Sequence, residues 1–358
     1  MNNERILAIN PGSTSTKIAV YEGNKNIFLK TIRHTPEQLQ CCRKITDQFS
    51  FRKEIILKEL KAAGIDLNSI KVVVGRGGLV KPIPSGVYEV NARLIEDLKE
   101  GVTGEHASNL GGLIADEIAR SLNNAKAYIA DPVVVDELQD VARIAGHPLF
   151  KRLSIFHALN QKAIARLYAR SQNKNYEDLN LVIAHLGGGI SVGAHQKGKV
   201  IDVNNALDGE GPFSPERSGT LPAGQLATLC FSGQYTLEEV KKMITGNGGY
   251  MAYLNTNNAY EVEMAAREGD QKASLIQDAL AYQVAKEIGA MATVLKGNVD
   301  AIILTGGIAH NTYVVNYIKE MTSFIAPIIV YPGEDEMSAL AMNGLMVLRG
   351  EGKVGIYE

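Results

Sequence analysis

The 358-residue sequence has few cysteines, no tryptophan and no excess of charge of either sign. Its cysteines, the adjacent Cys41 and Cys42 and the separate Cys230, fit reduced thiols packed in helices better than a disulfide framework or a zinc site. The 37 basic and 39 acidic residues give a net charge of −2, which offers no attraction to nucleic acid or an anionic membrane. The apolar run "ILAI" near the start is too short for a signal peptide, and no run approaches a membrane span of roughly 20 residues. We therefore expect a cytoplasmic protein without nucleic-acid or membrane partners.

What is present indicates an α/β protein. The chain is longer than one hydrophobic core usually supports, which favours two domains. Hydrophobic residues make up 45% of it but aromatic residues only 6%, as in cores built from Val, Ile, Leu and Ala. Helices are predicted over residues 34–64, with Thr35 as N-cap and a stop at Gly64, and over 105–122, 153–171 and 271–297. Because apolar strands alternate with these helices, we expect parallel or mixed sheets.

Glycine-rich turns follow three apolar strands. Residues 6–17, "ILAINPGSTSTK", join a strand to backbone N–H groups and hydroxyls that can hold phosphate, although an ordinary hairpin has the same pattern. The stretch from Leu181, "LVIAHLGGGISVG", matches it at an offset of 175 residues, with Asn10 on His185 and Gly12 on Gly187. A duplicated β-hairpin at the start of each half, or two unrelated hairpins, would explain the match. A third junction, residues 300–311, ends in Gly306 and Gly307.

Two familiar nucleotide motifs are excluded. "GAHQKGKV" from Gly193 has the glycine and lysine spacing of a Walker loop, but Val200 stands where that loop needs Ser or Thr. It also leads into a strand rather than a helix. No G-x-G-x-x-G follows a predicted strand, so a Rossmann dinucleotide site has no support.

Five side chains near the predicted strand ends and loops could bind an anion or a metal. Arg76 and Arg217 lie in glycine-rich or proline-rich segments, and a guanidinium fits carboxylate or phosphate oxygens in a bidentate fork. His157 and His185 could donate hydrogen bonds, and Asp131 could hold hydrated magnesium. Solvated surface arginines, structural histidines and a turn-capping aspartate are the alternatives for these five residues.

Nine segments in order resemble the acetokinase family, and within it the butyrate kinases, over essentially the whole chain. They are "NPGSTSTK", "GRGG", "GEHASNLGG", "DPVVVDEL", "FHALNQKA", "HLGGGISVG", "DGEGPFSPERSGTLP", "LTGGIAHN" and "EDEMSALAMNG". The resemblance implies the duplicated two-domain actin-like, or ribonuclease H-like, ATPase fold of acetate kinases, sugar kinases, heat-shock ATPases and actin, with a nucleotide cleft between the domains. It implies an N-terminal domain of residues 1–131 plus 338–358 with the first phosphate hairpin. The C-terminal domain, 132–337, would carry the second hairpin and the adenosine loop.

The same resemblance assigns roles to residues. The catalytic set is Arg76, Asp131, His157, His185 and Arg217. ATP or ADP is held by Asn10, Gly12, Ser13, Thr14, Ser15 and Thr16, by Gly187, Gly188 and Gly189, and by Gly306, Gly307, Ile308, His310 and Asn311. Mg²⁺ is held by Asp131 and Glu336, although Glu334 and Asp335 adjoin the latter. The substrate pocket contains Gly77, Gly78, His106 and Phe156.

The implied reaction is the reversible, direct in-line transfer of a phosphoryl group from ATP to butyrate. Acetate kinase has a valine and a histidine where this chain has Gly77 and Gly78, which we interpret as room for a longer acyl tail. A short-chain acid has a carboxyl pKa of about 4.3, like Glu, so it is ionised at pH 7 and needs no general base, unlike the hydroxyl of a sugar. Acetate, propionate or isobutyrate remain alternative substrates, and a non-catalytic heat-shock-type ATPase is the alternative of another class. The resemblance also implies a homodimer or higher homo-oligomer.

Overall fold

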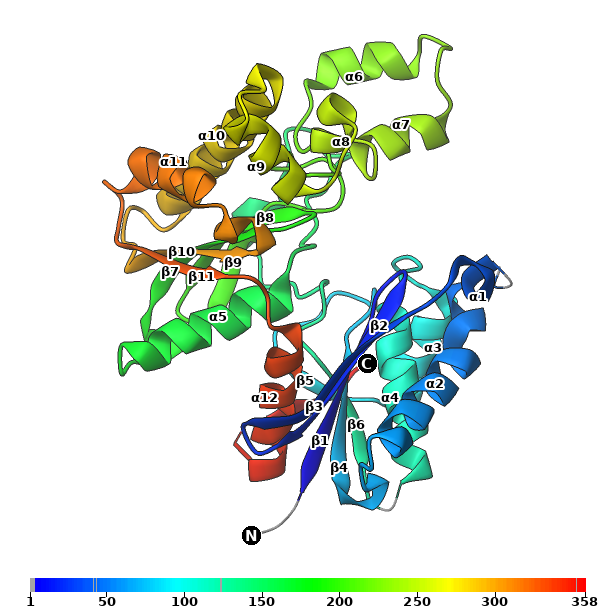
Figure 1. Cartoon of the computed structure of the whole chain (residues 1–358). Coiled ribbons are helices and arrows are strands. Elements are labelled where there is room, and N and C mark those ends of the chain that lie inside the picture. Colours follow the sequence, from blue (N-terminus) through cyan, green and yellow to red (C-terminus); the bar gives the residue numbers. More distant parts are fainter. Residues whose placement is uncertain (1–3, 41, 43, 123, 352) are drawn as a thin grey trace. The chain divides into compact units, whose positions relative to one another are not determined.

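The computed structural model describes residues 4–40, 42, 44–122, 124–351 and 353–358. The chain forms two compact units, each built on its own β-sheet (Figure 1). Unit 1 comprises Met1–Val135 and Asp335–Glu358, and unit 2 comprises Asp136–Glu334. No helix among the described residues is long and apolar enough to cross a membrane.

Unit 1 has a seven-stranded sheet in the order β12-β5-β6-β4-β1-β2-β3. Its strands are β1 (Arg5–Pro11), β2 (Ser15–Glu22), β3 (Lys25–Arg33), β4 (Ile70–Arg76), β5 (Val87–Glu89), β6 (Lys126–Ala130) and β12 (Val354–Gly355). Its helices are α1 (Pro36–Gln40), α2 (Phe49–Ala62), α3 (Ala92–Glu100), α4 (Asn109–Ser121) and α12 (Glu336–Arg349), with 3₁₀ helices at Ile45–Gln48 and Leu67–Ser69. Figure 1 shows α2, α3 and α4 on one face of the sheet and α12 on the other, so its central strands are buried on both sides.

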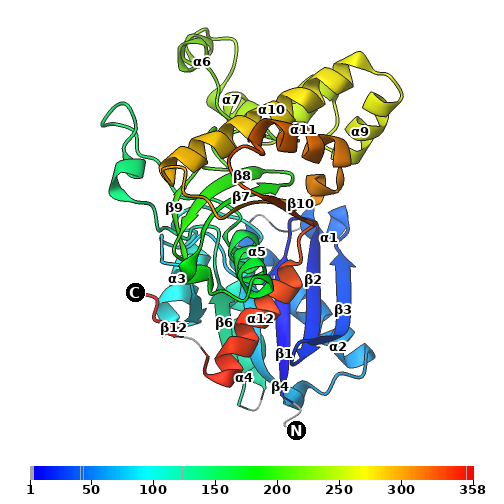
Figure 2. The same cartoon turned by 90° about the vertical axis from the view of Figure 1, so that its left-hand side faces the viewer.

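Unit 2 has a five-stranded sheet in the order β11-β10-β7-β8-β9. Its strands are β7 (Asn180–Leu186), β8 (Ile190–Gln196), β9 (Lys199–Val203), β10 (Ala301–Gly306) and β11 (Ile328–Pro332). Its helices are α5 (Ala158–Ser171), α6 (Ala223–Cys230), α7 (Leu237–Ile244), α8 (Gly249–Leu254), α9 (Ala259–Arg267), α10 (Gln271–Val294) and α11 (Thr312–Thr322), with 3₁₀ helices at Asp140–Arg143, Tyr176–Asp178 and Gly307–His310. Figure 2 shows α10 and α11 on one face of this sheet and α5 on the other.

The two sheets share one five-strand pattern, which confirms the predicted duplication. In β3-β2-β1-β4-β6 and in β9-β8-β7-β10-β11, the first three strands are antiparallel and the last two are parallel to the third. Strand β7 begins and ends 175 residues after β1, which is the offset found in the sequence. The rejected Walker-like segment forms the end of β8, its turn and the start of β9.

Three of the four predicted helices are present as single helices. They are α4, α5 and α10, and Gly297, with φ +74°, follows the end of α10 as expected. The fourth prediction, one helix over residues 34–64, is wrong. The chain begins α1 at Pro36 as predicted, but the backbone N–H of Lys44 is bound by the Asp47 side chain at 2.9 Å in a separate 3₁₀ turn before α2.

The cysteines do not pack in helices as expected. Cys230 ends α6 and is exposed, and Cys42 is half-buried outside any helix. Cys41 lies outside the described residues. Helix α6 has no buried residue at all, so an apolar residue in it has no core to enter.

Candidate active site

Three predicted site residues of unit 1 lie at one edge of its sheet. Strands β1, β4 and β6 run parallel, and their carboxyl ends carry Asn10, Arg76 and Asp131. Arg76 is paired in register with Ala130, the residue before Asp131. In α/β proteins, ligands bind at this edge of the sheet.

Arg76 and Glu336 form an ion pair at this edge. Arg76 Nη2 lies 3.0 Å from Glu336 Oε1, and Nη1 donates to Oε2 at 3.2 Å, so the contact is bidentate. Asn10 joins them, because its Nδ2 donates to Glu336 and its Oδ1 accepts from Arg76 at 3.3 Å. The structure thus brings together Asn10, which is predicted to bind phosphate, Arg76, which is predicted to bind substrate, and Glu336, which is predicted to bind magnesium.

The three neighbouring acidic residues have different surroundings. Asp335 caps α12 by accepting from Ser338 N at 2.9 Å. Glu336 is the first residue of α12, where the helix dipole favours a carboxylate. Glu334 belongs to unit 2 and lies 3.4 Å from His185 Nε2. Only Glu336 of the three therefore contacts Arg76.

Asp131 is buried and anchors a loop. Its Oδ1 accepts from Ser85 Oγ at 2.6 Å and from Gly86 N at 2.9 Å. Its backbone has a φ of +36°, a left-handed value that is strained for a residue other than glycine and typical of functional sites. These contacts match the turn-cap alternative and also hold the carboxylate in one place at the strand end.

A residue that the sequence reading missed, Arg52 of α2, holds the first predicted phosphate loop. Its guanidinium is fully buried and donates to the carbonyls of Gly12 at 2.8 Å and of Ser13 and Ser15 at 3.1 Å. It also donates to Thr16 Oγ1 at 3.1 Å. The loop therefore turns its carbonyl groups towards Arg52. The sequence does contain a signal for the burial of Arg52, because this residue shares one helix face with the apolar Ile56 and Leu60, four and eight residues further along.

Burial shifts two pKa values beside this loop. It lowers the pKa of Arg52 to about 10, which leaves the guanidinium charged at neutral pH. It lowers the pKa of His34 to about 4, with help from the Arg52 charge. His34 Nε2 lies 2.8 Å from Thr16 Oγ1, so a neutral histidine adjoins the loop.

The interpretation of Gly77 and Gly78 as open space is wrong. A Cβ on Gly77 would lie 2.5 Å from Pro132 Cβ, and one on Gly78 would lie 2.6 Å from Asn109 Cα. The space beyond both glycines is thus filled by packed protein atoms and cannot receive an acyl tail. Their lack of side chains serves the close approach of neighbouring backbone.

The two other predicted pocket residues differ in exposure. His106 is exposed, and its Nδ1 lies 2.8 Å from Ser108 Oγ at the start of α4. Phe156 is almost completely buried, directly before His157 in unit 2. A buried ring there supports the chain that leads to His157.

The unit 2 histidines lie together at the equivalent edge of the second sheet. His185 is near the end of β7, and its ring stacks on that of His157, with centroids 3.8 Å apart and planes at 10°. His185 Nδ1 lies 2.9 Å from Asn160 Oδ1 of α5. The structure thus brings these two predicted residues together.

Arg217 lies directly on the second glycine loop. A Cβ on Gly189 would come within 1.9 Å of Arg217 Nη1, so only glycine leaves room for the guanidinium. Arg217 donates to Ala206 O, but its buried Nε has no hydrogen-bond partner among the described residues. Burial lowers the pKa of Arg217, against the opposing charge of Glu216. An unpartnered, buried N–H of this kind fits an anionic oxygen.

The predicted adenosine loop adjoins β7. Gly306 has a φ of +90°, and a Cβ there would lie 2.4 Å from Leu186 O, so β10 ends against the end of β7. Gly307, Ile308 and His310 form a 3₁₀ turn. Asn311 caps α11 by accepting from Tyr313 N at 3.0 Å and also donates to Gln277 at 3.0 Å. Its side chain is therefore used within the protein.

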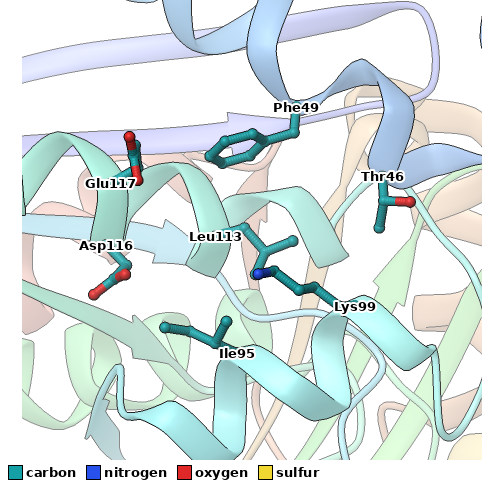
Figure 3. Close-up of a pocket in the computed structure, with 7 residues that line it drawn as sticks. All are labelled: Thr46, Phe49, Ile95, Lys99, Leu113, Asp116 and Glu117. Atoms are coloured by element: carbon teal, nitrogen blue, oxygen red, sulfur yellow. The ribbon is translucent and has the colours of Figure 1, made fainter.

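No predicted site residue lines the pocket drawn in Figure 3. This pocket of unit 1 has a volume of about 320 Å³ and is lined by Thr46, Phe49, Ile95, Lys99, Leu113, Asp116 and Glu117, from the 3₁₀ turn at Ile45–Gln48 and from α2, α3 and α4. Among the described residues, no three His, Cys, Asp or Glu side chains are grouped so as to hold a metal ion.

Known proteins match this chain over nearly its full length. The family model described as "Acetokinase family" matches residues 149–324. The chain is 60% identical to "Butyrate kinase 1" of Clostridium acetobutylicum and 58% identical to "Probable butyrate kinase" of Bacteroides thetaiotaomicron, and each match covers at least 99% of both chains.

The fold is also that of a solved structure. Acetate kinase of Porphyromonas gingivalis superposes with a TM-score of 0.79 at 19% identity, covering 96% of this chain and all of that one. This likeness shows the expected duplicated actin-like ATPase fold. Because relatives of about 60% identity cover nearly the whole sequence, the chain belongs to the acetokinase family.

Proposed function

We propose that this protein is a butyrate kinase, which transfers a phosphoryl group from ATP to butyrate and forms butyryl phosphate and ADP. The reaction is reversible and makes ATP when it runs from the acyl phosphate. The observation that carries the proposal is the near-full-length identity to proteins named butyrate kinase. The geometry of the two sheet edges supplies groups suited to two anionic substrates.

Charge neutralisation is the main task of such a site. Butyrate is ionised at neutral pH, with a pKa of about 4.3, so the nucleophile needs no base but must approach an anionic phosphate. Arg76 and Arg217 are the cations that we assign to the substrate carboxylate and the transferring group. The buried Nε–H of Arg217 has no hydrogen-bond partner among the described residues and can donate to such an anion. The guanidinium of Arg76, by contrast, also binds the carboxylate of Glu336.

The phosphates of ATP are assigned to the two glycine loops. Arg52 holds three carbonyls of the Gly12–Thr16 loop, and we assign the hydroxyls of the exposed Ser13 and Thr14 to phosphate oxygens. The Gly187–Gly189 loop lies against Arg217, and the stacked His157 and His185 supply further donors. The turn from Gly306 to Asn311 is assigned to the adenosine.

Magnesium fits the donor chemistry of unit 1. Asp131 and Glu336 would hold it, since Mg²⁺ usually binds one or two carboxylates and completes its shell with water and phosphate oxygens. The lack of a three-residue cluster among the described side chains agrees with that mode. When bound, the ion neutralises charge on the phosphates. Asn10 and Arg76 orient the Glu336 carboxylate meanwhile.

Hydroxamate trapping of the acyl phosphate tests the function. The wild type is assayed with ATP, magnesium and straight and branched acids from C2 to C6, and we expect the highest kcat/KM with butyrate. A higher value with acetate, propionate or isobutyrate would identify a related acyl kinase, and ATP hydrolysis without hydroxamate would favour the heat-shock-type alternative. Arg76→Ala and Arg217→Ala should each lose at least about 10²-fold in turnover, whereas the exposed Arg120→Ala should not.

We also propose a cytoplasmic homodimer or higher homo-oligomer. Five large hydrophobic side chains between residues 141 and 153 of unit 2 are exposed, and a second copy would cover them: Val141, Ile144, Leu149, Phe150 and Leu153. Sedimentation velocity of the wild type and of Phe150→Glu tests this surface. A wild-type monomer, or an unchanged assembly in the variant, contradicts it.

A further inference from the structure

We propose that a buried row of hydrogen bonds in unit 2 determines which ring nitrogen of His157 carries the proton. The row, here called the His157 row, runs through Tyr176, His195, Gln161, Ser191 and His157. It joins the 3₁₀ turn at Tyr176–Asp178, strand β8 and helix α5. Gln161, Ser191 and His195 are completely buried, so their side chains have no contact with solvent.

The orientation of the Gln161 amide is fixed by a carbonyl. Its Nε2 lies 3.0 Å from the backbone oxygen of Ser191, which can only accept, so this atom is the amide nitrogen. Gln161 Oε1 then faces His195 Nε2 at 2.8 Å. An amide oxygen can only accept, and His195 Nε2 must therefore carry a hydrogen.

His195 has a single proton. Burial keeps its pKa well below the ordinary value, and the nearby charge of Lys162 acts in the same direction. Because Nε2 holds the hydrogen of the neutral ring, Nδ1 is an acceptor. It lies 2.6 Å from the Tyr176 hydroxyl, which donates to it.

Ser191 connects the Gln161 amide to the His157 ring. Its Oγ accepts from Gln161 Nε2 at 2.9 Å and from the backbone N of His157 at 3.4 Å, which uses both lone pairs. The hydroxyl hydrogen then points to His157 Nδ1, 2.8 Å away. Since Nδ1 accepts, the proton of a neutral His157 is on Nε2.

This arrangement suits a group that meets an anion, and its catalytic consequence depends on the proposed function. With the proton on Nε2, His157 can donate to a phosphoryl oxygen, whereas the other tautomer would present a lone pair to it. Gln161, Ser191 and His195 are thus positioning residues for His157.

The tautomer can be measured without any substrate. Two-bond ¹H–¹⁵N spectra of the full-length protein with ¹⁵N-labelled histidine report the protonated ring nitrogens, and His157→Gln identifies the His157 signals. At a pH where the ring is neutral, we expect its proton on Nε2. An Nδ1–H tautomer in the wild type would overturn the proposal, whether or not the protein makes butyryl phosphate.

Two variants test the row itself. Ser191→Ala removes the hydroxyl that donates to His157 Nδ1. Gln161→Met removes the amide that donates to Ser191 Oγ. We expect both to show His157 protonated at Nδ1 in part of the molecules and kcat about 10- to 100-fold lower, as for other side chains that orient a functional histidine. Tyr168→Phe, which removes a hydroxyl from the same buried cluster as Tyr176, is the control and should change neither. Unchanged His157 signals in both folded variants would contradict the row.

Discussion

Gly189 is the position where one methyl group should move the side chain of Arg217, which we assign to the substrate anions. A Cβ there would lie 1.9 Å from Arg217 Nη1 and 2.6 Å from Cζ, against at least 3.4 Å for an ordinary contact. In Gly189→Ala the guanidinium must therefore move by about 1.5 Å. The backbone of Gly189 is not in the left-handed region, so alanine itself causes no strain there.

The expected cost falls on activity rather than on stability. A displacement of about 1 Å in a positioning group costs about 10²-fold, so we expect a loss of about this size in kcat/KM for butyrate. The melting temperature should change little, because the atoms displaced are the end of a flexible side chain. Gly224→Ala in α6 is the control, since its Cβ would meet nothing within 4 Å and the residue lies outside the loop assigned to phosphate.

Hydroxamate assays and thermal melts of both variants decide the outcome. Equal activity in Gly224→Ala and Gly189→Ala would refute the reasoning. So would additive losses when Gly189→Ala is combined with Arg217→Ala, because a change that acts through Arg217 has little left to remove in its absence.

Three further changes have defined outcomes. Arg52→Met removes the side-chain donor to the carbonyls of Gly12, Ser13 and Ser15 and should lower the free energy of unfolding by at least about 2 kcal/mol and raise the KM for ATP, with partial recovery in Arg52→Lys. Unchanged denaturation curves would contradict this. Gly77→Val should reduce kcat/KM for acetate, propionate and butyrate alike and lower the melting temperature, whereas a selective shift towards acetate would revive the pocket interpretation. His34 is protonated below about pH 6.5 in the unfolded chain but only below about pH 4 in the native protein. Its contribution therefore makes the free energy of unfolding fall as the pH drops from about 6.5 to about 4. Chemical denaturation of His34→Gln should show a smaller change of this free energy with pH than the wild type.

Strand ends were the part of the site that the sequence could predict. An apolar run followed by a polar residue placed Asn10, Arg76 and His185 at the carboxyl ends of strands, and the structure has them there. The duplication was visible because β1 and β7 kept the same length and spacing. The meeting of Glu336 with Arg76 joins residues 260 apart in the chain, and only the resemblance to a family indicated it.

Errors arose where packing, not local pattern, decides the structure. The helical pattern of residues 34–64 contains no glycine or proline between Pro36 and Gly64 that would mark the break before α2. Gly77 was interpreted from the side chain that it lacks, although Pro132 occupies that place. A sequence comparison reveals a missing side chain but not what fills the space.

Both glycine loops lie against an arginine that forms no ion pair among the described residues; Arg52 is fully buried and Arg217 is half-buried. Arg52 holds the loop at Gly12 through uncharged carbonyls, and Arg217 covers Gly189. Burial lowers the pKa of both guanidinium groups, so the folded protein keeps each charge at a cost in free energy. A bound phosphate would offset that cost. A carboxylate paired with the arginine would instead have weakened the attraction between the arginine and the phosphate. In this respect the two loop arginines differ from Arg76, which forms an ion pair with Glu336 at the sheet edge.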